Sequence, residues 1–400
     1  MRDVKREAAL VLCVLLMAAL VLCAGCKKPE PAGTGAGVAP VTPGKTAEAK
    51  PAATFKVAIS SRPGQWNLEE RVRGYRETFA TYYPEIEVIQ EIDDETKYSA
   101  GAKKASDVIS ANPDIAGFVG CNAASGPGVA TAVRDASKVG DILIVAMDAD
   151  SKILDEIEAG VIIASVAQRQ YYMTYIGVKY LYALNHGYAV RPGETPAEGQ
   201  VAVPDTIYTG TVEVNKGNAA LFRTPSQGAK EELAEKHPDW VDLLKDHKPG
   251  EAGPNEEYVM IGISTGVEYW NANKAGLEDV CRELGVKATF TGPQDQDPPA
   301  QATQLDQIMA RKPAGILIAP GNEDTLKPYI DKAIDEGIPV ICVDTDAPSS
   351  KRVAYFGTSN YEAGVMGAHI MARALFEKAG LPVREIPDEA AAEGAKPAEG

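Results

Sequence analysis

Two blocks of the chain alternate short β-rich runs with longer helical runs, and this alternation constrains the fold more than any other feature. In the first block, the pattern predicts strands at 55–60, 87–90, 115–119, 142–147 and 161–166, with helices at 66–82, 100–111, 127–137, 151–158 and 170–184. In the second, it predicts strands at 258–263, 288–290, 316–319 and 339–343, with helices at 270–284, 300–310, 324–335 and 361–378. Such alternation is typical of parallel sheets with crossover helices, so the sequence predicts an α/β fold.

The two blocks also share local motifs. Each has a Trp-Asn pair at the start of its first helix, at Trp66 and Trp270. Each has an apolar strand that ends in Asp-x-Asp, at Asp148 and Asp344. The offsets between these pairs are 204 and 196 residues, so one architectural unit is used twice. We therefore expect two similar lobes that face each other.

The ends of the chain and the segment between the blocks have other compositions. Residues 1–25 have the basic start and apolar run of a signal peptide. The run Leu22-Cys23-Ala24-Gly25-Cys26 resembles a bacterial lipobox, with Cys23 where an aliphatic residue is usual. We expect lipidation at Cys26, with an uncleaved membrane anchor as the alternative. Residues 26–53 are predicted to be a flexible tether, 225–256 a bridging connector with a surface helix at 231–245, and 381–400 a disordered tail.

Composition and motifs narrow the function. The chain carries 40 Lys and Arg against 56 Asp and Glu, and this acidic balance disfavours nucleic acid as a partner. Cys121, Cys281 and Cys342 lie in apolar runs without metal-ligand spacing and are predicted to be buried thiols. No phosphate-binding loop, zinc motif or nucleophile elbow occurs. We expect no cofactor, no metal and no enzymatic activity.

Ligands of open parallel sheets bind beyond the carboxyl ends of the strands, so polar residues at these positions are the candidates. The first block offers Arg71, Asp94, Asn122, Asp148 and Gln168, and the second offers Tyr269, Trp270, Asp344 and Thr345. Carboxylates, amides and Arg beside an aromatic ring suit a sugar or polyol. Other roles stay open: the Asp residues as helix caps, Arg71 on a solvated face, Asn122 and Gln168 in turns, and Trp270 in the core.

Four segments carry a family resemblance. Residues 67–75, 160–168, 338–348 and 355–364 resemble the type I periplasmic sugar-binding proteins, the ribose-binding-like branch of ABC transporter substrate-binding proteins. The resemblance implies two Rossmann-like parallel-sheet lobes with a hinge and an interlobe cleft. It implies ligand contacts at Arg71, Asn122, Asp148, Gln168, Tyr269, Trp270 and Asp344. Thr345 replaces the arginine of pentose binders, which puts ribose in doubt.

The order of the two halves differs from that of the family. Residues 54–224 resemble the family's C-terminal half, and 257–380 resemble its N-terminal half, so the chain looks like a circular permutant. A permutant needs its new ends close together. We therefore predict that the strand at Phe55 and the helix ending near Lys378 lie in one lobe. Asn360 and the segment near Ala167 are expected at hinge crossings.

The resemblance implies a bacterial lipoprotein outside the cytoplasm, anchored to the cell membrane or in the periplasm. It would be a monomer that binds a small sugar or polyol between its lobes and delivers it to an ABC-type permease. A sugar-sensing receptor for chemotaxis or a membrane kinase is the alternative, and an enzyme on the same fold is a more distant one.

Overall fold

The computed structural model describes residues 55–224, 229–245, 253 and 255–384. The predicted signal peptide, the tether and Cys26 lie outside the described residues, as does the tail beyond residue 384. None of the helices in the described part is long and apolar enough to cross a membrane.

The first lobe is built on a six-stranded sheet with the order β2-β1-β3-β4-β5-β9. All neighbours are parallel except β9, which runs antiparallel to β5. The strands of this sheet are β1 (Phe55–Ser61), β2 (Ile86–Asp93), β3 (Ile115–Gly120), β4 (Leu143–Met147), β5 (Ala164–Gln168) and β9 (Thr211–Asn215). The central strands are buried along their length because helices cover both faces.

The second lobe has an all-parallel sheet with the order β11-β10-β12-β13-β14-β8. Its strands are β8 (Thr206–Tyr208), β10 (Glu257–Ile261), β11 (Lys287–Thr291), β12 (Gly315–Ile318), β13 (Val340–Val343) and β14 (Ala354–Gly357). A separate two-stranded pair joins β6 (Ala189–Val190) to β7 (Val201–Ala202).

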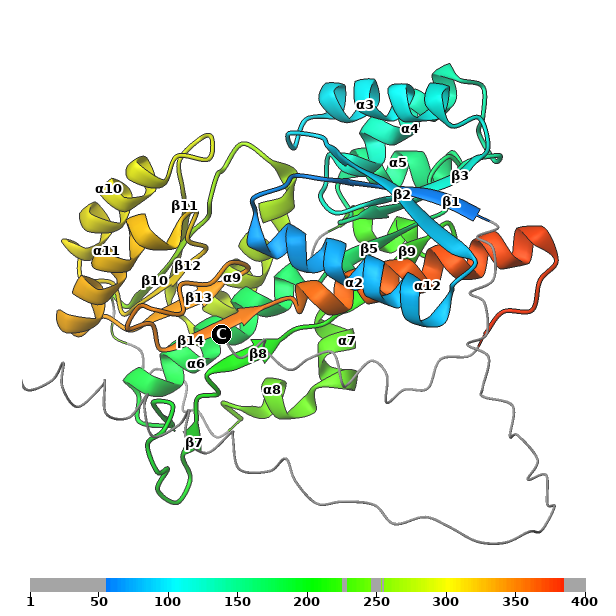
Figure 1. The fold of residues 1–400 in the computed structure, drawn as a ribbon. Helices are drawn as coiled ribbons and strands as arrows, with labels where there is room; N and C mark the ends of the chain where they lie inside the picture. Colours follow the sequence, from blue (N-terminus) through cyan, green and yellow to red (C-terminus); the bar gives the residue numbers. More distant parts are fainter. Residues whose placement is uncertain (1–54, 225–228, 246–252, 254, 385–400) are drawn as a thin grey trace, which may run out of the picture. The chain divides into compact units, whose positions relative to one another are not determined.

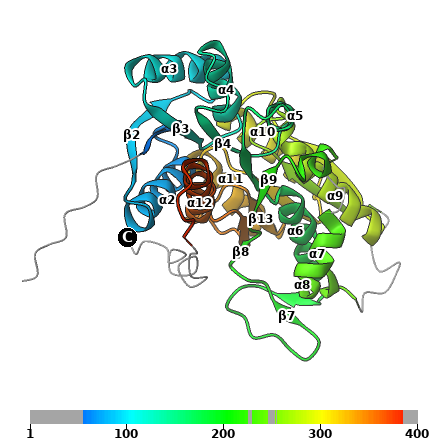
Figure 2. The same ribbon diagram turned by 90° about the vertical axis from the view of Figure 1, so that its right-hand side faces the viewer.

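Helices flank both sheets, and each lobe includes helices from both halves of the chain. The first lobe carries α2 (Trp66–Tyr82), α3 (Tyr98–Ala111), α4 (Ser125–Asp135), α5 (Ser151–Glu158), η1 (Ala219–Arg223) and α12 (Asn360–Ala379). The second carries α6 (Gln170–Asn185), α7 (Ala229–Lys236), α8 (Pro238–Asp242), η2 (Glu268–Trp270), α9 (Asn271–Leu284), α10 (Pro298–Met309) and α11 (Glu323–Asp335). Helices α2 and α12 run side by side in both views (Figures 1 and 2).

Within the described residues, the chain passes between the lobes at three points. It leaves the first lobe after β5 and enters α6, returns between β8 and β9, and returns again between β14 and α12. A further passage, from η1 of the first lobe to α7 of the second, includes residues 225–228, which lie outside the described residues. The expected hinge positions near Ala167 and at Asn360 lie at the first and third of these crossings. Three adjacent connecting segments between two compact lobes allow a hinge motion that opens and closes the space between the lobes.

The helices after the first and third crossings, α6 and α12, pack closely on α9 and α2, respectively. An added Cβ at Gly74 of α2 would lie 2.3 Å from the carbonyl oxygen of Tyr361, and one at Gly276 of α9 would lie 2.4 Å from that of Tyr171. Only glycine allows backbones to approach so closely. The same close helix–helix contact, here called the helix joint, therefore occurs in both lobes.

The structure corrects three details of the predicted elements. The surface helix expected at 231–245 is two helices, α7 and α8, because Pro238 begins a new helix after His237. The fifth strand lies at Ala164–Gln168 and not at 161–166, because residues 159–163 form a turn after α5. Strand β14 was not predicted as a strand, although its residues belong to a resemblance segment.

Candidate ligand-binding site

Asp148 and Asp344 occupy equivalent positions, each directly after the fourth strand of its lobe. Both have left-handed backbones, with φ of 73° and 66°. Asp148 donates its backbone N–H to Val166 and accepts from Ser165 Oγ at 2.6 Å. Asp344 donates to Phe356 and accepts from Tyr355 Oη at 2.9 Å. These contacts hold an unusual turn in place, so the position of each carboxylate is set by its own sheet.

Each carboxylate accepts one side-chain hydrogen bond. Oδ1 of Asp148 accepts from Nε2 of Gln168 at 2.8 Å, and Oδ1 of Asp344 accepts from the Tyr269 hydroxyl. Within the described part of the chain, the second oxygen of each accepts none. Each Asp therefore keeps acceptor capacity that a ligand hydroxyl can use.

Arg71 is buried, at 4% exposure, and its charge acts on both carboxylates. Its Nε donates to Oδ1 of Asn360 at 2.8 Å, and its Nη1 donates to the carbonyl oxygen of Cys121 at 2.8 Å. The first contact ties α2 to the start of α12 at a hinge crossing. A guanidinium held by neutral partners keeps its full charge for the carboxylates around it.

The pKa shifts show that the groups of the two lobes act on one another. Burial raises the pKa of Asp344 to about 6, while the Tyr269 hydroxyl and Arg71 lower it and Asp148 raises it. Burial also raises the pKa of Asp148, and Arg71 opposes this. The pKa of Tyr269 is well above its usual value because of burial and the charges of Asp344 and Asp148. Arg71, Asp148, Tyr269 and Asp344 therefore form one cluster that spans both lobes, here called the central cluster.

Asp94 and Asn122 lie in the same lobe as Asp148 but are engaged by the protein itself. The carboxylate of Asp94 is fully buried and accepts from Ser60 Oγ, Ser125 Oγ and Asn122 Nδ2 at 2.5 to 3.1 Å. Asn122 Oδ1 accepts from the backbone N–H groups of Ala124 and Ser125. This network fixes the ends of β1, β2 and β3, and ligand contact by Asp94 or Asn122 stays a prediction.

The two aromatic candidates, Tyr269 and Trp270, have different roles in the structure. Trp270 is 4% exposed and belongs to the core of the second lobe, where it meets Tyr269 edge-on at 5.0 Å. Tyr269 carries its hydroxyl to Asp344, so Trp270 supports the residue that reaches the central cluster. Thr345 donates its hydroxyl to the carbonyl oxygen of Pro320 at 2.9 Å and lines a cavity.

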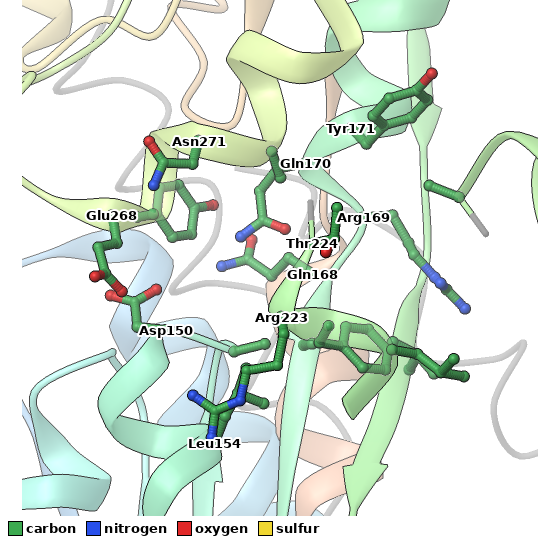
Figure 3. Close-up of a pocket in the computed structure, with 18 of the residues that line it drawn as sticks. Asp150, Leu154, Gln168, Arg169, Gln170, Tyr171, Arg223, Thr224, Glu268 and Asn271 are labelled. Atoms are coloured by element: carbon green, nitrogen blue, oxygen red, sulfur yellow. The ribbon is translucent and has the colours of Figure 1, made fainter. Parts of the chain in front are cut away.

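Two cavities flank the central cluster. One has a volume of about 460 Å³ and is lined by residues of both lobes, among them Asp150, Gln168, Gln170, Glu268 and Tyr269 (Figure 3). The other, of about 620 Å³, is lined by Gln65, Trp66 and Asn67 of the first lobe and by Asn322, Thr345 and Asp346 of the second. The space between the lobes is therefore polar on both sides of the cluster.

Sequence reasoning missed Gln170, Glu268 and Thr358. Thr358 directly follows β14, and its buried hydroxyl has no partner among the described residues. Thr358 lies 190 residues after Gln168, and Tyr361 lies 190 residues after Tyr171. This shared offset between the two blocks would have identified Thr358 as the counterpart of Gln168. Gln170 and Glu268 have no motif, and only the folded crossing and the η2 turn bring them to the cavity.

The three cysteines of the described residues are buried thiols of low reactivity. Cys121, Cys281 and Cys342 are free and buried, as predicted, and burial raises the pKa of both Cys121 and Cys281 to about 12. Thiols of this kind are poor nucleophiles and metal ligands at neutral pH. The described residues contain no group of three or more acidic, His or Cys side chains that would hold a metal ion.

Two α/β lobes, three crossings between them and a polar interlobe cleft define a two-lobed binding protein of the type I periplasmic architecture. A family model described as the periplasmic binding protein domain matches residues 44–188 and 258–391. The chain belongs to this family.

One solved structure shares this fold over most of its length, and others resemble part of the chain. A substrate-binding protein of a sugar ABC transport system from Bordetella parapertussis 12822 is 12% identical over 85% of this chain and 86% of its own, with a TM-score of 0.51. A sugar-binding protein of a sugar ABC transporter from Bacillus halodurans is 32% identical over 42% of this chain, with a TM-score of 0.38. The arabinose-binding protein AraP from Geobacillus stearothermophilus is 28% identical over 42% of this chain, with a TM-score of 0.37. The chain covers 56% of each of these last two proteins. No curated protein sequence matches the chain.

Proposed function

We propose that this protein binds a small sugar or polyol in the cleft between its lobes. The observation that carries the proposal is the pair of carboxylates at Asp148 and Asp344, one from each lobe, both influenced by the charge of Arg71. Each retains an oxygen that accepts from a hydroxyl, and Arg71 balances one of the two charges. A ligand with several hydroxyls satisfies both lobes at once, which favours their closure.

The connections between the lobes fit this role. The three crossings lie together, and Ser151 of the first lobe donates its backbone N–H to Glu268 of the second at 2.9 Å. A closed cleft removes water from the carboxylates, so each hydroxyl contact gains strength. The similar proteins named above include sugar-binding and arabinose-binding proteins, which supports a ligand of the same class.

A thermal-shift screen of the full-length protein against pentoses, hexoses and polyols tests the proposal. A ligand present at 100 times its Kd stabilises the folded state by about 2.7 kcal/mol, so the true ligand raises the Tm by several degrees. A screen in which no sugar or polyol raises the Tm would overturn the proposal.

We further propose that the protein is a monomeric lipoprotein outside the cytoplasm and that it delivers its ligand, unchanged, to an ABC-type permease. The lipobox-like run before Cys26 supports the anchor, and the family supports the delivery. Labelling of cells with a radioactive fatty acid should mark the wild-type protein and not Cys26→Ala. Equal labelling of both would exclude Cys26 as the acceptor, and a ligand recovered in altered form would contradict a binding role.

We also propose that the halves stand in permuted order. Strand β1 and helix α12 lie in one lobe, with the rings of Phe55 and Phe376 5.9 Å apart, as the permutation predicts. The β8–β9 crossing lies in the middle of this chain, whereas the resemblance puts it at the family's C-terminus. A rearranged chain that starts at Glu257, links Gly380 to Phe55 and ends at Thr224 should fold and keep the ligand. Failure to fold with several linker lengths would contradict the permutation.

A further inference from the structure

The smaller cavity brings together two carboxylates from opposite lobes. Asp150 precedes α5 of the first lobe, and Glu268 begins η2 of the second. Their carboxylates point toward one another across the cavity (Figure 3). Glu268 Oε2 accepts the backbone N–H of Ser151, whereas Asp150 makes no capping bond to α5. The Asp150 carboxylate is therefore not consumed by the helix that it precedes.

The other charges around the cavity are already balanced. Arg169 forms a two-point ion pair with Glu232, and Arg223 pairs with Asp155 and Glu158 at 2.7 and 2.8 Å. In the described part of the chain, neither Asp150 nor Glu268 has a Lys, Arg or His partner. Lys152, two residues from Asp150, places its Nζ over the ring of Tyr98 at 4.6 Å. The cavity therefore carries an excess of negative charge.

The equivalent position in the second lobe shows what a balanced carboxylate looks like. Asp346 follows Asp344 as Asp150 follows Asp148. Arg352 donates to both oxygens of Asp346, at 2.5 and 2.8 Å, and the backbone N–H of Ala347 donates a third bond at 2.7 Å. Asp150 lacks both kinds of partner, so its charge is available to something outside the chain.

A second observation, independent of the acidic pair, also points to a ligand. The side chain of Gln170 is 9% exposed and makes no hydrogen bond within the described residues. Its amide projects into the cavity beside that of Gln168 (Figure 3). The amide therefore faces the cavity with its donors and acceptor free, and a ligand in the cavity can complete its hydrogen bonds.

We propose that this cavity is a subsite for an ammonium group, and that the ligand is an amino sugar whose amine lies between Asp150 and Glu268. The inference rests on the proposed sugar-binding function. The sugar hydroxyls bind the central cluster, and the amides of Gln168 and Gln170 bind the part of the ligand between the two. An ammonium carries three donors and one positive charge, and the two carboxylates accept its hydrogen bonds and balance its charge.

The ionisation of the site supports this assignment. Burial, together with the charges of Asp148 and Glu268, raises the pKa of Asp150 to about 7. Tyr98 of α3 also faces Asp150, and the charge of Asp150 raises the Tyr98 pKa after burial does. A neutral ligand leaves these carboxylates uncompensated when the lobes close. A cation removes the repulsion, so a positive charge on the ligand adds affinity.

Matched pairs of ligands test the proposal on the full-length protein. Calorimetry near pH 7 would compare glucose, galactose and mannose with their 2-amino-2-deoxy counterparts. We expect the amino member of the best-binding pair to bind about tenfold more tightly than the neutral member or better, equivalent to about 1.4 kcal/mol. Neutral members that bind as tightly as the amino members would overturn the ammonium subsite and leave the sugar-binding function intact.

Two variants locate the effect. Asp150→Asn and Glu268→Gln should each reduce the ratio of amino to neutral affinity to about threefold or less. Asp107→Asn removes the same charge from an exposed position of α3 and should keep the wild-type ratio. A ratio that Asp107→Asn lowers as much as Asp150→Asn does would reduce the effect to net charge and overturn the subsite. Binding of simple diamines without any sugar would overturn the sugar-binding function instead, and a protein that binds neither class would overturn both.

Discussion

Asp150 and Asp346 occupy the same position after equivalent strands, but among the described residues only Asp346 has an ion-pair partner. Arg352, whose side chain is 8% exposed, binds both oxygens of Asp346, whereas Asp150 faces Glu268 of the other lobe. The repeated fold fixes where each carboxylate lies, and the surrounding side chains decide whether its charge is structural or available to a ligand. The two ends of the cleft thus share a geometry and differ in function.

The largest expected effect separates the two residues by stability. Asp346→Asn leaves the buried guanidinium of Arg352 without its two-point partner, so we expect the free energy of unfolding to fall by about 3 kcal/mol. Asp150→Asn removes a carboxylate that has no cation and should not destabilise the protein above pH 7. Denaturant titration of both variants at pH 8 measures this difference. Equal losses of stability in the two variants would contradict the proposed difference between Asp150 and Asp346.

The helix joints test where the lobes are alike. Gly74→Ala and Gly276→Ala each force a Cβ into a backbone carbonyl at 2.3 or 2.4 Å, and we expect losses of about 1–3 kcal/mol in both. The two losses should agree within about 1 kcal/mol because the joints are equivalent. A loss confined to one variant would show that the pseudo-symmetry does not extend to the joints.

The pH dependence of the ligand-free protein sharpens the comparison further. Asp150 has a folded pKa raised to about 7 and Asp344 one raised to about 6, so the folded state binds more protons than the unfolded state between about pH 4 and 7. The stability from these groups is therefore complete below pH 4 and is lost as the pH rises through 6 and 7. We expect a loss on the order of 1–2 kcal/mol from Asp150 after solvent screening. Thermal unfolding between pH 5 and 8 should show a shallower slope for Asp150→Asn. An unchanged slope would contradict the raised pKa of Asp150.

The smallest expected effect is at Thr358, the counterpart of Gln168. Its buried hydroxyl has no partner among the described residues, so Thr358→Val should change the free energy of unfolding by less than about 0.5 kcal/mol. Thr174→Val is the matched control, because the Thr174 hydroxyl donates to the carbonyl oxygen of Asn273 at 2.7 Å and its loss should cost about 1 kcal/mol. A large loss of stability in Thr358→Val would show that the Thr358 hydroxyl already has a hydrogen-bond partner in the ligand-free protein.

Most of the fold could be predicted from local pattern. Helices α2 and α5 begin and end at the predicted residues. The apolar period and the strand-end Asp residues identify these elements directly. The break of the connector helix at Pro238 was also readable from the sequence, because proline begins a helix more readily than it continues one.

The site was only partly predictable, because its geometry comes from contacts distant in sequence. Arg71 meets Asn360 across 289 positions, and no local pattern shows which strand-end carboxylates keep a free oxygen. Asp94 and Asp148 look alike in the sequence, but a network of hydroxyls and an amide surrounds the first, whereas the second has only Gln168 at its side chain. Glu268 escaped notice because a lone Glu in a short turn has no motif until the opposite lobe is placed beside it.

Calorimetric titration of Asp148→Asn, Asp344→Asn and the double variant tests the central claim most directly, with the sugar that gives the largest thermal shift as ligand. If one molecule binds both lobes, each single variant should lose about 100-fold in affinity, a few kcal/mol, because ligand hydroxyls lose a charged acceptor. The double variant should show no measurable binding. Single variants that both bind within threefold of the wild type would contradict a ligand held between the two carboxylates.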